Sequence, residues 1–551
     1  MSNSTLVLIA PLQALLDTIF PSGGEQSTLD FLAFAKTHSL ELALGALTVL
    51  IAPRIYAILR GANKFSELDG PRPASFIWGD EGILYHPENG LSTHMELLSQ
   101  YGSMCRMKGA LGEDQLWIAD PRAMNDVILK GTDYFHEPDG LISWFKLAFG
   151  PNILTAKGHK HKIQRKASRA PTPVFHNIAH YLQDIVASRV RDNGNNTGII
   201  DIYKWMNNVA LEMIGQAGVG HSFGVMEDKE IQYLDASHQV LPLINSMWYI
   251  RPFLPTLTRL GPPGFRRFIL DHVSFGPAQQ LKKAADVMDK MANEIYVKKK
   301  ESLANGTLDS EIAAGNDIIS MLLKQNKVVS PEEQMTEEEI ISQVNGLVFA
   351  GHDTTSGALA RTLHLLAQEP NVQEQLRAEI REAHSLYGKD LDYDQLNSLK
   401  YLDAVCRESL RLWSPSQTLE RVAMKDWSLP LQYPIKSKDG KKTVTNIHVP
   451  KGTHIYLSIS SANRDKKTWG KDAEKFNPSR WLQPLPLSVG ESKIPALQND
   501  IFGRSKVLHF ELGPEEHIWS AAGVVKPHVK HKDGTMDSVP SLRMKLTLVN
   551  E

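Results

Sequence analysis

Poor helix formers are concentrated in one stretch of the sequence, between residues 340 and 355, that otherwise has helical periodicity. These residues are Gly346, Gly351, Asp353, Thr354 and Thr355. A conflict between local helix propensity and the overall pattern is typical of functional sites. The hydroxyl of Thr354 can donate a hydrogen bond to the carbonyl of Ala350, which would bend the helix and open a groove. Close packing against another helix is the alternative interpretation.

Two further pairs of charged residues have helical spacing. His161 and Arg165 are four residues apart, so they share a helix face, and both can donate hydrogen bonds to a carboxylate. A solvated basic face is the alternative. Glu408 and Arg411 are three residues apart and can pair with each other. On the surface such a pair contributes only about 0 to 1 kcal/mol and requires no function.

The elements that carry these residues can be predicted from local signals. Thr336 and Glu339 form a capping box, and Pro370 cannot continue a helix, so we expect one long helix that ends at about Glu369. Strand patterns occur at 443–449, 454–458 and 544–549. The sequence therefore predicts one large, mainly α domain with a small β portion.

Together with the segments 463–465 (Asn-Arg-Asp) and 476–481 (Phe-Asn-Pro-Ser-Arg-Trp), these motifs resemble a known signature. In kind, order and spacing it is that of the cytochrome P450 haem-thiolate monooxygenases, and of the membrane-anchored fungal type in particular. The resemblance extends from about Gly70 to Trp481 and resumes weakly near Phe510. It implies a cytochrome P450-like fold.

The resemblance also implies roles for particular residues. Asp353 and Thr354 match the acid and alcohol that deliver protons in the dioxygen groove, and Gly351 belongs to the same groove beside the cofactor. His161, Arg165 and Arg421 match positions that hold the haem propionates. Glu408 and Arg411 match a buried pair that contacts a later arginine, here Arg480.

The implied reaction is the oxidation of small apolar molecules. It would use haem b, dioxygen, and electrons that NADPH–cytochrome P450 reductase supplies. No residue is assigned as a metal ligand.

The sequence departs from this family where the haem iron should be bound. The family has a glycine-rich loop with the iron-ligating cysteine, followed by a long helix, but here residues 482–509 are too few and have no sustained apolar periodicity. The only cysteines are Cys105 and Cys406. Because the thiolate promotes cleavage of the O–O bond, we expect the chain as written to be inactive.

Two histories would produce such a sequence. One is a translation that misreads an exon boundary, and the other is a non-catalytic relative with a binding or regulatory role. The later histidines 509, 517, 528 and 531 are conceivable substitute ligands, but no spacing singles one out.

Composition and the N-terminus suggest the cellular setting. The 551 residues include 60 basic and 62 acidic ones, so no strong positive field favours nucleic acid as a partner. Two cysteines in so long a chain favour a reducing compartment. The apolar stretch 40–59 precedes Arg60 and Lys64, so residues 1–65 are predicted to be a membrane anchor, with a transmembrane helix, and a linker. Residues 66–551 would then form a cytosolic P450-like domain at the endoplasmic reticulum, with an aberrant segment at 482–509.

Overall fold

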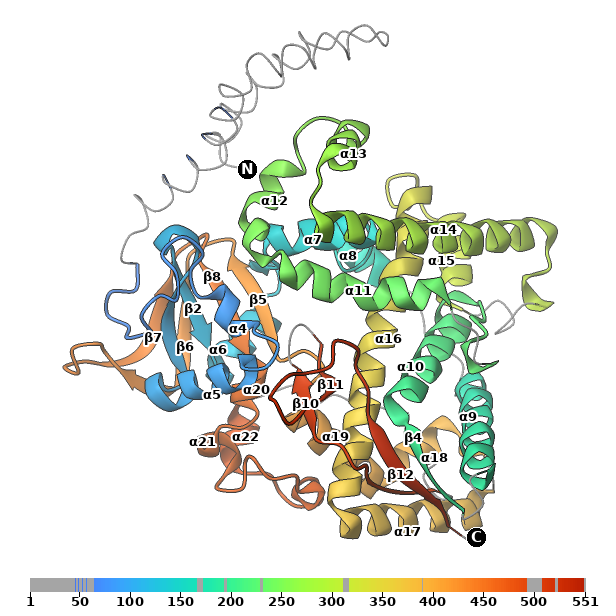
Figure 1. Cartoon of the computed structure of the whole chain (residues 1–551). Helices are drawn as coiled ribbons and strands as arrows, with labels where there is room; N and C mark the ends of the chain where they lie inside the picture. The colour runs from blue at the N-terminus through green and yellow to red at the C-terminus, as the bar shows by residue number, and fades with distance from the viewer. Residues whose placement is uncertain are drawn as a thin grey trace, which may run out of the picture.

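The computed structural model describes residues 64–165, 172–192, 196–227, 231–310, 317–388, 390–492, 508–520 and 524–549, together with residues 45, 48, 52 and 56. Within these residues the chain is mainly helical, and a small sheet region lies to one side of the helices (Figure 1). The predicted fold class is therefore confirmed.

The α-helices of the described residues vary from single turns to rods that cross the molecule. Their bounds are α4 (Glu81–Leu84), α5 (Gly90–Tyr101), α6 (Pro121–Asn125), α7 (Asp139–Phe149), α8 (Gly158–Arg165), α9 (Thr172–Asp192), α10 (Ile202–Met213), α11 (Gln232–Ser246), α12 (Leu254–Leu257), α13 (Pro263–His272), α14 (Gly276–Asn305), α15 (Ile318–Asn326), α16 (Glu337–Gln368), α17 (Pro370–Tyr387), α18 (Tyr393–Ser398), α19 (Lys400–Leu412), α20 (Ile459–Ala462), α21 (Lys466–Trp469) and α22 (Leu487–Ser492).

Helix α16 is the long helix that the sequence predicts. Its N-cap is Thr336, whose hydroxyl accepts from the backbone N–H of Glu339 at 3.2 Å. The carboxylate of Glu339 in turn accepts from the N–H of Thr336 at 2.9 Å, which completes the capping box. Its 32 residues extend roughly 48 Å at 1.5 Å per residue. In Figure 1 the yellow helix runs through the middle of the molecule, from α14 and α15 to α17.

The strands of the described residues form four separate sheets. The largest has the order β1-β2-β8-β5-β3, in which only β2 and β8 pair in parallel. Strands β6 and β7 pair antiparallel, as do β10 and β11, and the fourth sheet has the order β4-β12-β9. The strand bounds are β1 (Met104–Lys108), β2 (Asp114–Ile118), β3 (Phe135–His136), β4 (Thr197–Asp201), β5 (Thr418–Ala423), β6 (Trp427–Lys436), β7 (Thr443–Val449), β8 (His454–Ser458), β9 (Leu508–Leu512), β10 (His517–Ser520), β11 (Lys526–Val529) and β12 (Arg543–Leu548). The three predicted strand segments correspond to β7, β8 and β12.

The C-terminal strands return to the helical body. Strand β12 pairs with β4 from the first half of the chain on one side, and with β9 on the other. Figure 1 shows β12 in red beside β4 in green. Phe510 of β9 and Leu546 of β12 are buried in the same apolar cluster as Leu359 and Leu363 of α16. The chain that follows the segment predicted to be aberrant therefore contributes to the core.

No helix within the described residues is both long enough and apolar enough to cross a membrane. Apart from residues 45, 48, 52 and 56, the predicted anchor at 40–59 lies outside the described part of the chain.

Candidate active site

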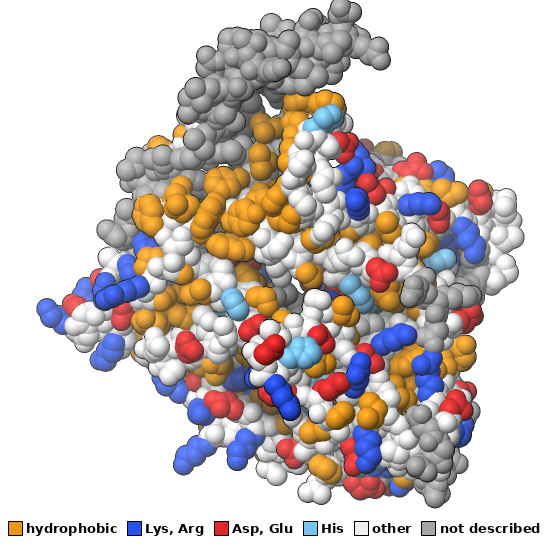
Figure 2. All heavy atoms as spheres, viewed as in Figure 1, with side chains coloured by type: hydrophobic (Ala, Val, Ile, Leu, Met, Phe, Trp, Pro, Cys, Tyr) orange, Lys and Arg blue, Asp and Glu red, His pale blue; other side chains and the backbone are white. Residues whose placement is uncertain are grey.

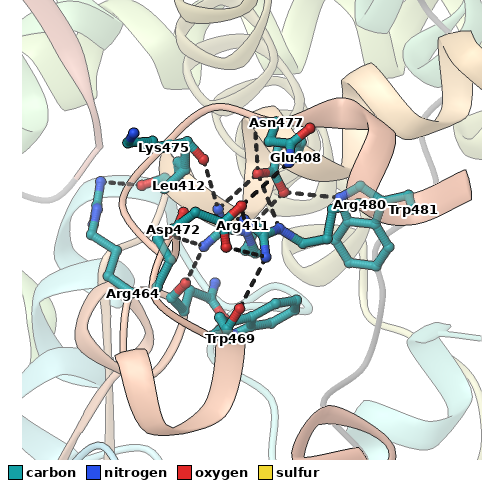
Figure 3. Close-up of polar contacts among 12 residues, drawn as sticks. Glu408, Arg411, Leu412, Arg464, Trp469, Asp472, Lys475, Asn477, Arg480 and Trp481 are labelled. Atoms are coloured by element: carbon teal, nitrogen blue, oxygen red, sulfur yellow. Dashed lines mark hydrogen bonds and ion pairs between the residues drawn. The ribbon is translucent and has the colours of Figure 1, made fainter. Parts of the chain in front are cut away.

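Glu408 and Arg411 of α19 form a buried ion pair (Figure 3). Their side chains are 0% and 2% exposed. Arg411 donates from Nε to Glu408 Oε2 and from Nη2 to Oε1, each at 2.8 Å, which is the bidentate geometry of a strong charge-assisted contact. The interpretation of this pair as a surface salt bridge is therefore wrong.

Residues of the later motif segment complete the contacts of Glu408. Arg480 lies in a short helix, η8 (Pro478–Leu482), with its Nε 3.4 Å from Glu408 Oε1. The indole of Trp481 and the backbone N–H of Asn477 each donate to the same carboxylate at 3.0 Å. Arg480 also donates to Asp472 Oδ2 at 2.7 Å. The network thus connects α19 to the segment 472–481 (Figure 3).

The centre of α16 contains the predicted backbone contact of Thr354. Its hydroxyl donates to the carbonyl of Ala350 at 2.7 Å. Gly351 faces Ile214 of η3 (Ile214–Val219), and a Cβ at this glycine would lie only 2.8 Å from the isoleucine side chain. Close packing therefore accounts for this glycine, while any contact of Gly351 with a cofactor remains a prediction.

Asp353 is fully buried in α16, and three basic or imidazole groups surround it. Lys526 of β11 donates from Nζ to Asp353 Oδ2 at 2.9 Å. The other oxygen, Oδ1, lies 3.8 Å from Nε2 of His238 and 3.7 Å from Nδ1 of His352. Burial alone would raise the pKa of Asp353, but the charge of Lys526 and the two imidazoles outweigh it and lower that pKa below its ordinary value.

The two histidines beside Asp353 come from different helices. His352 is in α16, whereas His238 is in α11, and their rings stack with centroids 5.1 Å apart. Burial is the main cause that lowers the pKa of His352 to about 4 and that of His238 to about 3, so both rings are neutral near pH 7. The three side chains have the composition and proximity of a metal-ligand set. Sequence reasoning missed His238, because nothing in its local pattern distinguishes it.

The residues predicted to hold haem propionates lie on two separate elements. Arg421, in β5, has its Nη2 3.2 Å from Glu137 Oε1 and donates from Nη1 to the carbonyl of Glu420. On α8, His161 is half-buried and Arg165 is exposed, and neither forms an ion pair within the described residues. Their role toward a cofactor therefore stays a prediction.

A buried charge network next to Arg421 was not predicted. Arg251, in η5 (Trp248–Phe253), donates to Glu420 at 2.9 Å and to Glu81 at 2.5 Å. His454 Nε2 lies 2.8 Å from the same Glu420 carboxylate. Burial alone would raise the pKa of Glu420. Arg251 and His454 have the larger effect, so the pKa of Glu420 is lowered below its ordinary value and the carboxylate is ionised. Because its members come from distant parts of the chain, local sequence patterns do not reveal this network.

The two cysteines lie in different cores. Cys105 is in β1 within the core of the largest sheet, and burial raises the pKa of its thiol far above the ordinary value. Cys406 is in α19 and packs in the core that includes Leu402 and Val405. Both side chains are buried.

The protein combines a mainly helical fold with the long motif helix α16 and a buried network of Glu408, Arg411 and Arg480. Sequence comparison identifies the protein family to which the chain belongs. The family model described as Cytochrome P450 matches residues 70–485. Cytochrome P450 monooxygenase 91 of Postia placenta is 35% identical over 503 residues, which cover 85% of this chain and 92% of that protein. Ganoderic acid synthetase CYP5150L8 of Ganoderma lucidum is 35% identical over 459 residues, or 80% and 83% of the two chains. The chain belongs to the cytochrome P450 family.

Members of this family are haem-dependent oxidoreductases. The residues of this chain fit that cofactor only in part. The roles predicted for Asp353, Thr354 and Arg421 toward this cofactor stay predictions. The two cysteines are buried in separate cores, and burial raises the pKa of the Cys105 thiol. No axial thiolate is therefore assigned among the described residues, and the absence of this ligand from the chain stays a prediction.

Proposed function

We propose that this chain descends from cytochrome P450 monooxygenases. We further propose that the protein with the present sequence does not complete the monooxygenase reaction. The observation that carries the proposal is the placement of Cys105 and Cys406, each inside an apolar core. A haem thiolate needs a deprotonated sulfur at the iron, whereas a thiol buried in apolar surroundings stays protonated. The family match also ends at residue 485, before the segment that should supply the ligand.

The intact enzyme of this lineage would oxidise small apolar molecules. It would take electrons from NADPH–cytochrome P450 reductase. In that enzyme Asp353 and Thr354 would deliver protons, with Gly351 in the same groove, and His161, Arg165 and Arg421 would hold the haem propionates. The burial of Asp353 and the contact of the Thr354 hydroxyl with the carbonyl of Ala350 support the first assignment.

Membrane association, at the endoplasmic reticulum, is the second part of the proposal. Apolar side chains gather on the upper part of the face in Figure 2, over α12 and α13. Phe268 and Ile269 of α13 are among the exposed apolar residues, as are Phe76 and Ile77 at 72% and 52%. A patch of this kind fits a membrane surface or another apolar partner.

Deleting residues 1–65 tests the membrane proposal. The truncated chain should move to the soluble fraction at low salt, whereas the full chain should stay with membranes. A full-length protein that is soluble without detergent would contradict the anchor.

Sequencing the transcript that encodes this chain tests the proposal that the chain is inactive. We expect the region that encodes residues 495–510 to contain, in another frame or a skipped exon, a glycine-rich segment with one cysteine and an amphipathic helix. A chain that carries this segment should bind haem with a thiolate ligand. If every transcript encodes the present sequence and no such segment exists nearby, the non-catalytic interpretation is correct, and the proton-delivery roles of Asp353 and Thr354 are withdrawn.

A further inference from the structure

Four buried polar atoms around Asp353 lack hydrogen-bond partners among the described residues. They are Nε2 of His238, Nδ1 and Nε2 of His352, and Oδ1 of Asp353. Leaving one such group unsatisfied costs about 1 to 3 kcal/mol, so native structures rarely concentrate several of them at one point. The concentration indicates that something else satisfies these atoms.

We propose that His238, His352 and Asp353 bind a divalent transition-metal ion, with Zn²⁺ as the representative. One ligand atom from each side chain lies within 4.8 Å of the other two. Two imidazole nitrogens and one carboxylate oxygen are a ligand set that such ions prefer over Mg²⁺ or Ca²⁺. This inference goes beyond the proposed function and does not depend on whether haem binds.

The three ligand atoms are close together but must contract around such an ion. Asp353 Oδ1 is 3.8 Å from His238 Nε2 and 3.7 Å from His352 Nδ1. Ligand atoms that are each about 2.1 Å from a metal lie roughly 3 to 3.5 Å from one another. The ligand nitrogens of His238 and His352 lie within 4.8 Å of each other, so closing the site requires side-chain movements of up to about 1 Å. His238, whose side chain is partly exposed, sits at the edge of the site.

Lys526 is the main opposing charge. Its ammonium group occupies Oδ2 of Asp353 and leaves Oδ1 without a partner. A cation this close repels a divalent ion, so the site should bind weakly with the lysine present and more tightly without it. The Lys526→Met variant should raise the affinity for Zn²⁺ by about tenfold or more. A surface site elsewhere in the chain would not respond to this change.

Calorimetric titration of the chelator-treated full-length protein with ZnCl₂ tests the proposal. We expect a site with one Zn²⁺ per chain, and a melting temperature that rises with Zn²⁺ because the ion binds the folded state. His238→Gln and His352→Gln should each weaken this binding by about a hundredfold, since each removes one of three ligands. His531→Gln is the matched control, because His531 also lies beside a carboxylate, that of Asp537, but on the surface.

The outcomes separate the site from binding elsewhere. Loss of binding in both buried-histidine variants, with wild-type affinity in the control, supports the proposal. Unchanged affinity in His238→Gln, or no Zn²⁺-dependent rise in melting temperature of the wild type, overturns it. If His352→Gln does not fold, His238→Gln decides alone. Neither readout involves haem, so a negative result leaves the proposed function untouched.

Discussion

Lys526 Nζ lies 2.9 Å from Asp353 Oδ2, and the two residues come from opposite sides of the aberrant segment. The backbone next to Lys526 also lies against α16, since a Cβ at Gly357 would be only 2.4 Å from the carbonyl oxygen of Val525. The C-terminal chain therefore packs directly on the helix that carries the central motif. The segment predicted to depart from the family, 482–509, lies between Asp353 and Lys526 in the sequence.

The Asp353–Lys526 contact should be strongly coupled. Asp353→Asn leaves the ammonium group of Lys526 buried without a counter-charge, so we expect a loss of about 3 to 5 kcal/mol in the free energy of unfolding. The double variant with Lys526→Met should recover most of this loss. Urea unfolding with a chelator present measures both, and strictly additive effects would show that the two groups do not interact.

The buried network at Glu408 should matter far more than a surface pair. Glu408→Gln weakens the contacts to Arg411 and Arg480 while keeping the shape of the side chain, and should destabilise the fold by about 3 to 5 kcal/mol. The matched control is Glu67→Gln, which breaks the exposed contact to Lys442 and should cost under about 1 kcal/mol. Equal effects in urea unfolding would contradict the assigned burial.

Buried His94 should make the fold sensitive to acid. Its Nδ1 accepts from the indole of Trp117 at 2.8 Å, its Nε2 lies 3.0 Å from the hydroxyl of Thr418, and burial lowers its pKa to about 4. Since the unfolded chain binds the proton near pH 6.5, stability should fall as pH drops from 6.5 to 4. The loss is roughly 3 kcal/mol, at about 1.4 kcal/mol per pKa unit.

His94→Gln tests this acid sensitivity. Glutamine can keep both hydrogen bonds but does not titrate in this range, so its stability should depend less steeply on pH below 6.5. An unchanged slope in urea unfolding across pH 4 to 6.5 would assign the acid sensitivity to other groups.

Replacing Arg361 should stabilise the protein. Its guanidinium is buried, stacks on Trp413 and Trp519, and lies 2.7 Å from Nδ1 of His364, but it has no carboxylate partner within the described residues. Burial and the charge of Arg464 lower its pKa to about 9. We expect Arg361→Met to raise the free energy of unfolding by about 1 to 2 kcal/mol, because it removes an unpaired buried charge.

Arg377→Met is the matched control for that substitution. Arg377 is equally buried, but it pairs with Glu374 and donates to the carbonyl of Leu508, so its loss should destabilise the fold. If thermal unfolding shows that both variants destabilise equally, the contacts of Arg361 with His364, Trp413 and Trp519 outweigh the cost of burying its charge, and the prediction is wrong.

Local signals predicted much of this fold. Thr336 and Glu339 are three residues apart and Pro370 stops the helix, so the bounds of α16 could be predicted from the sequence nearly to the residue. His238 could not be predicted, since only the packing of α11 against α16 brings it to Asp353. The same holds for Arg251, whose partner Glu420 is 169 positions away. Long-range pairing depends on tertiary packing, which a single sequence does not show.

This cytochrome P450 family chain is predicted to lack an iron-ligating thiolate. This prediction is tested most directly by the reduced carbon monoxide difference spectrum of the full-length protein, expressed with a supply of haem. We predict that the thiolate-type band is absent, because Cys105 and Cys406 lie in separate apolar cores. A normal thiolate-type band would contradict the account, since one of these two buried cysteines would then have to bind the iron.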